Sequence, residues 1–337
     1  MRRDRTYKNI HLLAILGLLL ALLVSCRIPG VSTTSLKTEK YTPVTLTNCG
    51  LTITYKQPPQ RVVTMTQSAT EVMLALGLDK HIVGTAYQDN PSLPEYQQAY
   101  ARIPVLAQKY PSQEVFLSVE PDFVYTTEES AFEKNAIGAR EELLNIGINS
   151  YLLPIECERP ELRPQRVTTE NLYQQVREIG QIFGVKARAE KLVVEMRSQL
   201  QITQKQLGKV KKRQRIFWYD SEDPPLTVSN WGIPERIIEL AGGENIFKDI
   251  QKKEAWTIVN WEDVIERQPD VIVLIDASWS PAEKKRQLLK SNPAYSKLKA
   301  VQQNKFIVLE FNYTIPGIRN ITGVKKLAAA LYPERFK

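Results

Sequence analysis

Histidine is nearly absent from this sequence. The 337 residues contain only His11 and His81. A protein site for a transition metal needs several nitrogen, sulfur or carboxylate ligands, and the carboxylates around His81 show no ligand spacing. We therefore expect His81 to be structural and expect no metal ion bound directly by side chains. A tyrosine-rich site for bare ferric iron stays open as an alternative.

The usual signatures of catalysis are missing too. There is no Gly-x-Ser-x-Gly turn and no glycine-rich phosphate loop, and Cys49 and Cys157 would have to share one histidine as their base. The net charge of +8 is spread along the chain, without a basic cluster interleaved with aromatic residues. The sequence thus predicts neither an enzyme nor a nucleic-acid-binding protein, and it predicts no resident cofactor.

No apolar run reaches the roughly 20 residues that a membrane-spanning helix needs. The run over residues 12–24 follows a basic segment and has the length of a signal-peptide core. It ends in Leu23-Val24-Ser25-Cys26, which resembles a bacterial lipobox. We predict a lipoprotein signal peptide over 1–25 and lipidation of Cys26, which would anchor an exported protein to the membrane, facing the periplasm or the cell exterior. An ordinary signal peptide with an incidental cysteine, or an uncleaved anchor, is the alternative.

Cysteine is scarce, with three residues in the chain. Beyond Cys26 only Cys49 and Cys157 remain. An even pair of cysteines in an exported chain predicts a disulfide, and two unpaired buried thiols are the alternative.

The body of the chain alternates between strand-like and helix-like segments. Such alternation indicates an α/β fold with mostly parallel sheets. The periodicity of apolar residues and the positions of glycine and proline predict helices over 68–78, 113–119, 132–144 and 169–183, and strands over 51–55, 61–65, 81–86, 122–126, 148–153 and 215–219.

The longest helical pattern divides this body into two parts. Leu192, Met196, Leu200 and Leu207 fall on one stripe of a helix over 186–210. We therefore predict a flexible tether over 26–46, rich in Ser, Thr, Lys and Pro, an N-terminal α/β lobe over 47–185, the connecting helix, and a C-terminal α/β lobe over 211–337. An ordinary long surface helix is the alternative to a connecting one.

The two parts also repeat each other weakly. Residues 70–77 match 234–241, and residues 114–124 match 262–272, with Glu, Pro and Asp in one register. Both matches occur in the same order in each half. One short match would be chance, whereas two in order indicate two similar lobes that flank the long helix.

Several of these stretches resemble the periplasmic binding proteins of the iron-siderophore and cobalamin uptake family, which serve ABC importers. The motifs that carry the resemblance lie at 59–63, 68–71, 120–124, 241–247 and 268–274, and together they cover about residues 50 to 335. The resemblance implies two lobes joined by a rigid helix, a ligand cleft between them, and delivery of the ligand to a permease with its ATPase. We expect a monomer that rocks only slightly on binding.

Aromatic and hydroxyl side chains gather where the predicted strands end, and ligands of open α/β sheets sit at the carboxyl ends of strands. Aromatic rings there could stack on a bulky ligand while amides and hydroxyls orient it. For each aromatic residue alone, a place in the core is an equal alternative. The candidate ligand-binding residues are Gln67, Ser68, Tyr87, Thr127, Tyr219, Trp231, Trp279, Tyr313 and Arg319.

The resemblance also implies exposed glutamates that pair with arginines of the permease. Glu133 in the first lobe and Glu283 in the second match by position, with Glu128 and Glu129 as nearby alternatives. Charge pairs of this kind mainly set register and encounter rate.

The identity of the cargo stays open at this point. An iron(III)-siderophore chelate is the leading expectation, and cobalamin, another corrinoid or a deazaflavin precursor is the alternative. Arg319 is the main arginine near the predicted cleft, with Arg102 less certain, so the sequence favours a less charged chelate. A surface adhesion lipoprotein is the competing class, and it would leave the duplicated lobes unexplained.

Overall fold

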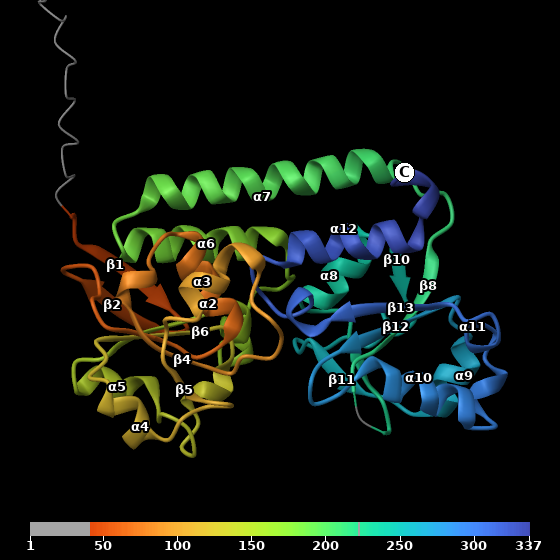
Figure 1. Cartoon of the computed structure of the whole chain (residues 1–337), viewed down its shortest axis with the longest axis horizontal. Coiled ribbons are helices and arrows are strands. Elements are labelled where there is room, and N and C mark those ends of the chain that lie inside the picture. The colour runs from red at the N-terminus through yellow and green to blue at the C-terminus, as the bar shows by residue number, and fades with distance from the viewer. Residues whose placement is uncertain (1–40, 222) are drawn as a thin grey trace, which may run out of the picture. The chain divides into compact units, whose positions relative to one another are not determined.

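The computed structural model describes residues 41–221 and 223–337 (Figure 1). The predicted signal peptide, Cys26 and most of the predicted tether therefore lie outside the described residues. The tether prediction is wrong at its end, because strand β1 already begins at Val44. No helix in the described part of the chain is long and apolar enough to cross a membrane.

The N-terminal lobe is built on a parallel sheet of five strands, in the order β5-β4-β3-β6-β7. Strands β3 and β6 are fully buried, as expected where helices cover both faces of a parallel sheet. An antiparallel hairpin of β1 and β2 precedes the sheet. The strands are β1 (Val44–Asn48), β2 (Leu51–Tyr55), β3 (Val62–Thr64), β4 (Ile82–Ala86), β5 (Val105–Ala107), β6 (Phe123–Thr126) and β7 (Asn149–Leu152); the helices are α2 (Gln67–Ala75), α3 (Gln97–Tyr100), α4 (Gln113–Ser118) and α5 (Arg140–Asn145).

The C-terminal lobe has a parallel sheet of four strands, in the order β10-β8-β12-β13. Strands β9 and β11 form a separate antiparallel pair. The strands are β8 (Gln214–Tyr219), β9 (Leu226–Val228), β10 (Gly243–Asn245), β11 (Trp256–Ile258), β12 (Val271–Asp276) and β13 (Phe306–Glu310); the helices are α8 (Ile233–Leu240), α9 (Trp261–Arg267), α10 (Ala282–Ser291), α11 (Lys299–Gln302) and α12 (Asn320–Leu331). The architecture confirms the predicted α/β class with two lobes and parallel sheets.

Helix α7 (Lys186–Leu207) is shared by both lobes and runs over α6 (Thr169–Ile182) and α12 (Figure 1). Its predicted stripe is the buried face: Met196 lies in the core of the N-terminal lobe and Leu207 in that of the C-terminal lobe. The helix ends three residues before the predicted position 210, because Gly208 has a positive φ of 57°.

The internal repeat is visible in matching hydrogen bonds. Glu120 and Gln268 both have a left-handed backbone, with φ of 46° and 41°, and each precedes a Pro-Asp pair. The Asp122 carboxylate accepts a hydrogen bond from the backbone N of Arg61 (2.9 Å), and the Asp270 carboxylate accepts one from the backbone N of Arg215 (2.9 Å). The same turn therefore fixes β3 to β6 in the N-terminal lobe and β8 to β12 in the C-terminal lobe.

One predicted helix is wrong. In place of a helix over 132–144 the chain makes a 3-10 turn at Glu129–Phe132 and a short helix, α5. Between them Ile137 turns into the core with no exposed surface, and Gly138 has a φ of 90°, which ends the helical path. The other predicted helices and strands lie within a few residues of the observed ones.

Candidate functional site

A cavity of about 680 Å³ lies between the two lobes. It is bounded where β4, β5 and β12 end, which is the edge where ligands of open α/β sheets bind. Its volume is in the range of small-molecule sites. The N-terminal lobe contributes Tyr87, Gln88, Asp89, Val105, Ala107, Gln108 and Lys109, and the C-terminal lobe contributes Ser278 and Trp279.

Two of the predicted aromatic residues line this cavity, Tyr87 from the N-terminal lobe and Trp279 from the C-terminal lobe. Tyr87 follows β4 with a positive φ of 54° and packs against Tyr110, with ring centroids 5.0 Å apart. Trp279 sits in a tight turn after β12 and is 50 % exposed. The ring of Phe311 supports it edge-on at 5.4 Å. Half-exposed rings held by other rings offer rigid apolar walls to a ligand.

The cavity also contains a carboxylate that the sequence reasoning missed. Asp89 is half-buried, and burial raises the pKa of its carboxyl to about 6, while a hydrogen bond from the Trp279 side chain opposes the rise. Behind it, burial and the neighbouring Glu156 and Asp89 raise the pKa of Glu128 well above its ordinary value. The position of Asp89, two residues after a predicted tyrosine at a strand end, was the available signal.

Gln67 lies beneath the cavity rather than in it. Its side chain is fully buried, and Oε1 accepts hydrogen bonds from the backbone N of Asp89 (3.2 Å) and of Asn90 (3.1 Å). The same oxygen accepts one from Nδ2 of Asn312 in the other lobe (2.5 Å). Gln67 therefore fixes the loop that carries Asp89 and joins it to the C-terminal lobe.

Ser68 and Thr127 form a buried hydroxyl network in the N-terminal lobe. The Ser68 and Thr127 oxygens lie 2.8 Å apart, and Thr66 Oγ1 lies 2.9 Å from that of Thr127. Thr127 has no exposed surface. These hydroxyls connect α2 to the end of β6, and neither residue lines the cavity.

Arg319 is not a ligand-facing arginine, which corrects the prediction. Its guanidinium forms a buried ion pair with Glu71, with Nε to Oε2 at 2.7 Å and both side chains at most 3 % exposed. It also donates to the Pro91 carbonyl (3.0 Å) and lies over the ring of Tyr313. Tyr313 itself is 8 % exposed. Arg319 therefore belongs to the packing between the lobes, and Tyr313 is buried beside it.

Tyr219 and Trp231 occupy the core of the C-terminal lobe, the alternative that the sequence left open. Tyr219 packs edge-on against Trp261, with ring centroids 5.3 Å apart. Trp231 is 6 % exposed and its indole N–H donates to the Pro164 carbonyl at 3.3 Å. Burial on all sides removes these rings from the cavity walls.

The predicted docking glutamates are exposed on separate lobes. Glu133 follows the 3-10 turn after β6 and lines a second cavity of about 430 Å³ next to Cys49. Glu283 lies in the first turn of α10 and pairs with Arg286 at 3.0 Å. The alternative Glu128 is half-buried behind the cavity, so it is a poorer docking residue than Glu133.

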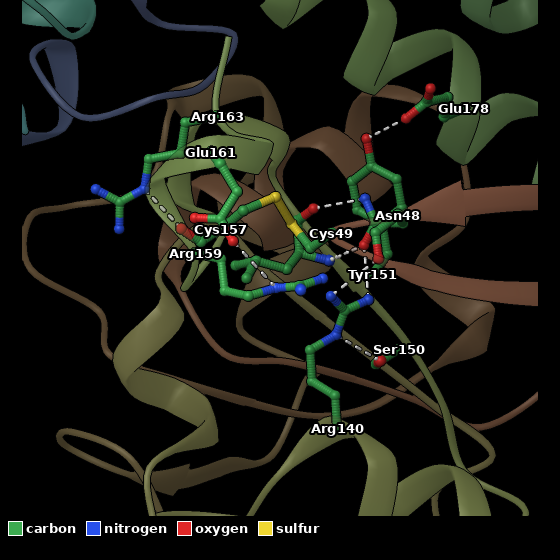
Figure 2. The surroundings of a disulfide bond; sticks show 11 residues. Asn48, Cys49, Arg140, Ser150, Tyr151, Cys157, Arg159, Glu161, Arg163 and Glu178 are labelled. Atoms are coloured by element: carbon green, nitrogen blue, oxygen red, sulfur yellow. Dashed lines mark hydrogen bonds and ion pairs between the residues drawn. A yellow bond between two sulfur atoms is a disulfide. The ribbon is translucent and has the colours of Figure 1, made fainter. Parts of the chain in front are cut away.

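The structure joins Cys49 to Cys157 by a disulfide, the pairing that the sequence predicts (Figure 2). Beside it Asn48 is buried, and its Oδ1 accepts hydrogen bonds from Arg140 (2.7 Å) and from the backbone N of Leu152 (3.0 Å). The disulfide thus links the turn of the β1–β2 hairpin to the segment after β7.

His81 has structural partners. Its Nδ1 lies 2.8 Å from the Pro59 carbonyl, and its ring packs edge-on against Phe183. Over residues 41–221 and 223–337, no group of three His, Cys, Asp or Glu side chains could hold a metal ion.

Comparison with known proteins places this geometry in a family. Residues 62–313 match the model of the periplasmic binding protein family. The chain is 25% identical to an uncharacterized ABC transporter substrate-binding lipoprotein, YvrC, of Bacillus subtilis, over 89% of each chain. It is also 25% identical to a vitamin B12-binding protein of Pectobacterium atrosepticum, over 65% of this chain and 73% of that one.

Solved structures agree with the sequence matches. A periplasmic binding protein of Veillonella parvula is 31% identical, with a TM-score of 0.76 over 86% of this chain and 98% of that one. A protein of an ABC-type Fe3+-hydroxamate transport system from Saccharomonospora viridis is 26% identical, with a TM-score of 0.73 over the same shares. The chain therefore belongs to the periplasmic binding protein family and is a substrate-binding transport protein rather than an enzyme.

Proposed function

We propose that this protein is the lipid-anchored substrate-binding component of an ABC importer and captures a bulky iron(III)-siderophore-type chelate. The observation that carries the proposal is the cavity of about 680 Å³ with Tyr87 on one lobe and Trp279 on the other. Walls from two lobes can enclose a ligand larger than either lobe holds alone. The similarity to the Fe3+-hydroxamate transport protein supports this class of cargo.

A corrinoid is the second candidate. It is supported by the vitamin B12-binding relatives, one of which aligns with 71% of this chain. A corrinoid has a broad, largely uncharged face, and aromatic walls suit it as well as they suit a chelate. Shape alone therefore favours neither cargo, and a binding experiment has to separate them.

Binding can be measured by calorimetric titration of the purified protein with a ferric trihydroxamate, a ferric tricatecholate and cyanocobalamin. We expect one chelate to bind with a 1:1 stoichiometry and Trp279→Ala to weaken it about fivefold, since a stacked ring contributes about 1 kcal/mol. Trp256→Ala, outside the cavity, is the matched control. Equal weakening by both substitutions would contradict the cavity as the site.

Delivery is proposed to use Glu133 and Glu283, which dock on arginines of the permease. Both carboxylates are exposed, one on each lobe, so a permease dimer could engage both at once. The double substitution Glu133→Ala and Glu283→Ala should abolish uptake at limiting solute and leave calorimetric binding unchanged. Unchanged uptake would refute this docking assignment.

Anchoring is proposed to depend on Cys26. Cys26→Ser should release the protein from the membrane fraction of cells while its solute affinity stays the same. Retention of the variant in the membrane fraction would point instead to an uncleaved signal segment.

A further inference from the structure

The cavity between the lobes is unevenly charged. Of the described residues that line it, Lys109 alone is basic, and Lys109 is exposed to solvent. Asp89 is half-buried in the wall, with the half-buried Glu128 and Glu156 behind it. Carboxyl groups are therefore concentrated in and behind the wall, and the one basic side chain of the lining lies at its exposed rim.

Two arginines, Arg319 beside the loop of Asp89 and Arg163, whose charge acts on Glu156, are already engaged. Arg319 is paired with Glu71. Arg163 donates to the carbonyl of Cys157 (2.6 Å) and to that of Lys253 (2.9 Å). A guanidinium held in this way cannot reorient toward an anionic ligand without leaving buried acceptors unpaired, which is costly.

Asp89, in contrast, has no cationic partner. Within residues 41–221 and 223–337 no ion pair includes Asp89, and the partner of its carboxylate is the neutral Trp279 side chain. Tyr87 lies two residues away in the same wall. A carboxylate flanked by aromatic rings is a setting that favours a cation, because the ring faces and the carboxylate both attract positive charge.

The loop that carries Asp89 is held from both lobes. Its backbone is fixed by Gln67, and the backbone N of Asn312 donates to Oδ1 of Asn90 (3.2 Å). Arg319 donates to the Pro91 carbonyl at 3.0 Å. A carboxylate on so constrained a loop is preorganised, so little ordering remains to oppose ligand binding.

We propose that Asp89 determines the charge class of the cargo: it binds a positively charged, hydrogen-bond-donating group of the ligand, and the cleft rejects polyanionic chelates. This inference rests on the proposed function, because it assumes that the interlobe cavity is the binding site. It narrows the cargo to chelates or corrinoids that are neutral overall or carry a positive charge. Gln67 acts as a positioning residue for Asp89.

The test uses matched probes that differ in charge. Ferrioxamine B is a ferric trihydroxamate with a free ammonium group, and its N-acetyl derivative keeps the chelate and loses the charge; aquocobalamin and cyanocobalamin form a second, cationic and neutral pair. A ferric tricatecholate is the anionic probe. Dissociation constants are measured by calorimetry for the natural protein, for Asp89→Asn, and for Glu266→Gln, an exposed carboxyl of α9 outside the cavity.

We expect the natural protein to bind the cationic member of one pair about tenfold or more tightly than the neutral member, as for a charged hydrogen bond. Asp89→Asn should remove that preference without changing the affinity for the neutral member, and Glu266→Gln should keep it. A purely structural role of Asp89 would weaken both members equally and would overturn the inference.

Two other outcomes distinguish a failure of the charge selection by Asp89 from a failure of the proposed function. Binding of either pair without regard to charge, or tight binding of the tricatecholate, leaves the proposed function standing and overturns the charge selection. Failure of every probe to bind refutes the proposed cargo, and the inference with it.

Discussion

Two glutamates at equivalent positions of the internal repeat have different surroundings. Glu71 of α2 is buried and forms an ion pair with Arg319, across the boundary between the lobes. Glu235 of α8 is also buried, yet its Oε2 accepts a hydrogen bond from Nδ2 of Asn245 within its own lobe, at 2.9 Å. Both halves of the repeat have a glutamate at this position. Its hydrogen-bond partner determines whether the carboxylate connects the two lobes or stabilises one of them.

The largest effect should come from removing the cation of the first pair. Arg319→Met leaves Glu71 buried without its partner, which costs roughly 3–5 kcal/mol. Urea denaturation of the variant measures this loss. The matched control is Glu71→Met with Arg319→Met, which removes both charges and should recover most of the stability. A loss in Arg319→Met no greater than that in Glu235→Gln would show that the pair does not hold the lobes.

The next largest effect should come from the disulfide, which is present in the N-terminal lobe in addition to the buried ion pair. Replacing Cys49 and Cys157 by serine opens a bond between residues 108 apart and should cost about 2–4 kcal/mol. Urea denaturation without reductant measures the loss, and the natural protein with reductant should match the variant. Free thiols at these positions in the denatured, unreduced protein would contradict the bond.

A smaller effect concerns the pH dependence of stability. Burial raises the pKa of Glu235 from 4.5 to about 7, so between these values the folded protein keeps a proton that the unfolded chain has lost. Stability therefore falls as the pH rises through this window. Glu235→Gln should remove about 1–3 kcal/mol of that fall.

The measurement is urea denaturation of Glu235→Gln and the natural protein from pH 4 to pH 8. Asp89 has a pKa raised in the same direction, so only the difference between the two proteins isolates Glu235. Parallel curves across the whole range would contradict the raised pKa. Glutamine keeps an oxygen that can accept the hydrogen bond from Asn245.

The order of elements could be predicted from the sequence because each signal is local. The stripe of Met196 and Leu207 follows from helical periodicity, and the Pro-Asp turns repeat with their neighbours. The interruption of the predicted helix over 132–144 could not be predicted, since Ile137 is buried in a core cluster with strand residues distant in the sequence, such as Val63 and Val124. Local periodicity carries no information about such tertiary packing.

The site was harder to predict than the fold. Tyr87 and Trp279 line the cavity while Tyr219 and Trp231 are in the core, although all four come near strand ends. What separates them is a partner distant in the sequence, such as the Trp261 ring against Tyr219. The same holds for Arg319, whose partner is 248 residues away along the chain.

The smallest expected effect is the motion of the lobes on ligand binding. Helix α7 contributes side chains to the cores of both lobes. The Glu71–Arg319 ion pair and the Gln67–Asn312 hydrogen bond also connect the two lobes. With these contacts intact, we expect the radius of gyration from solution scattering to change by less than about 1 Å. Arg319→Met should increase the change, because it frees one of these joints, whereas Glu235→Gln should leave it as it is. A large contraction of the natural protein would mean that the joints open and close with the ligand, and Glu71 would then serve as a latch rather than a fixed link.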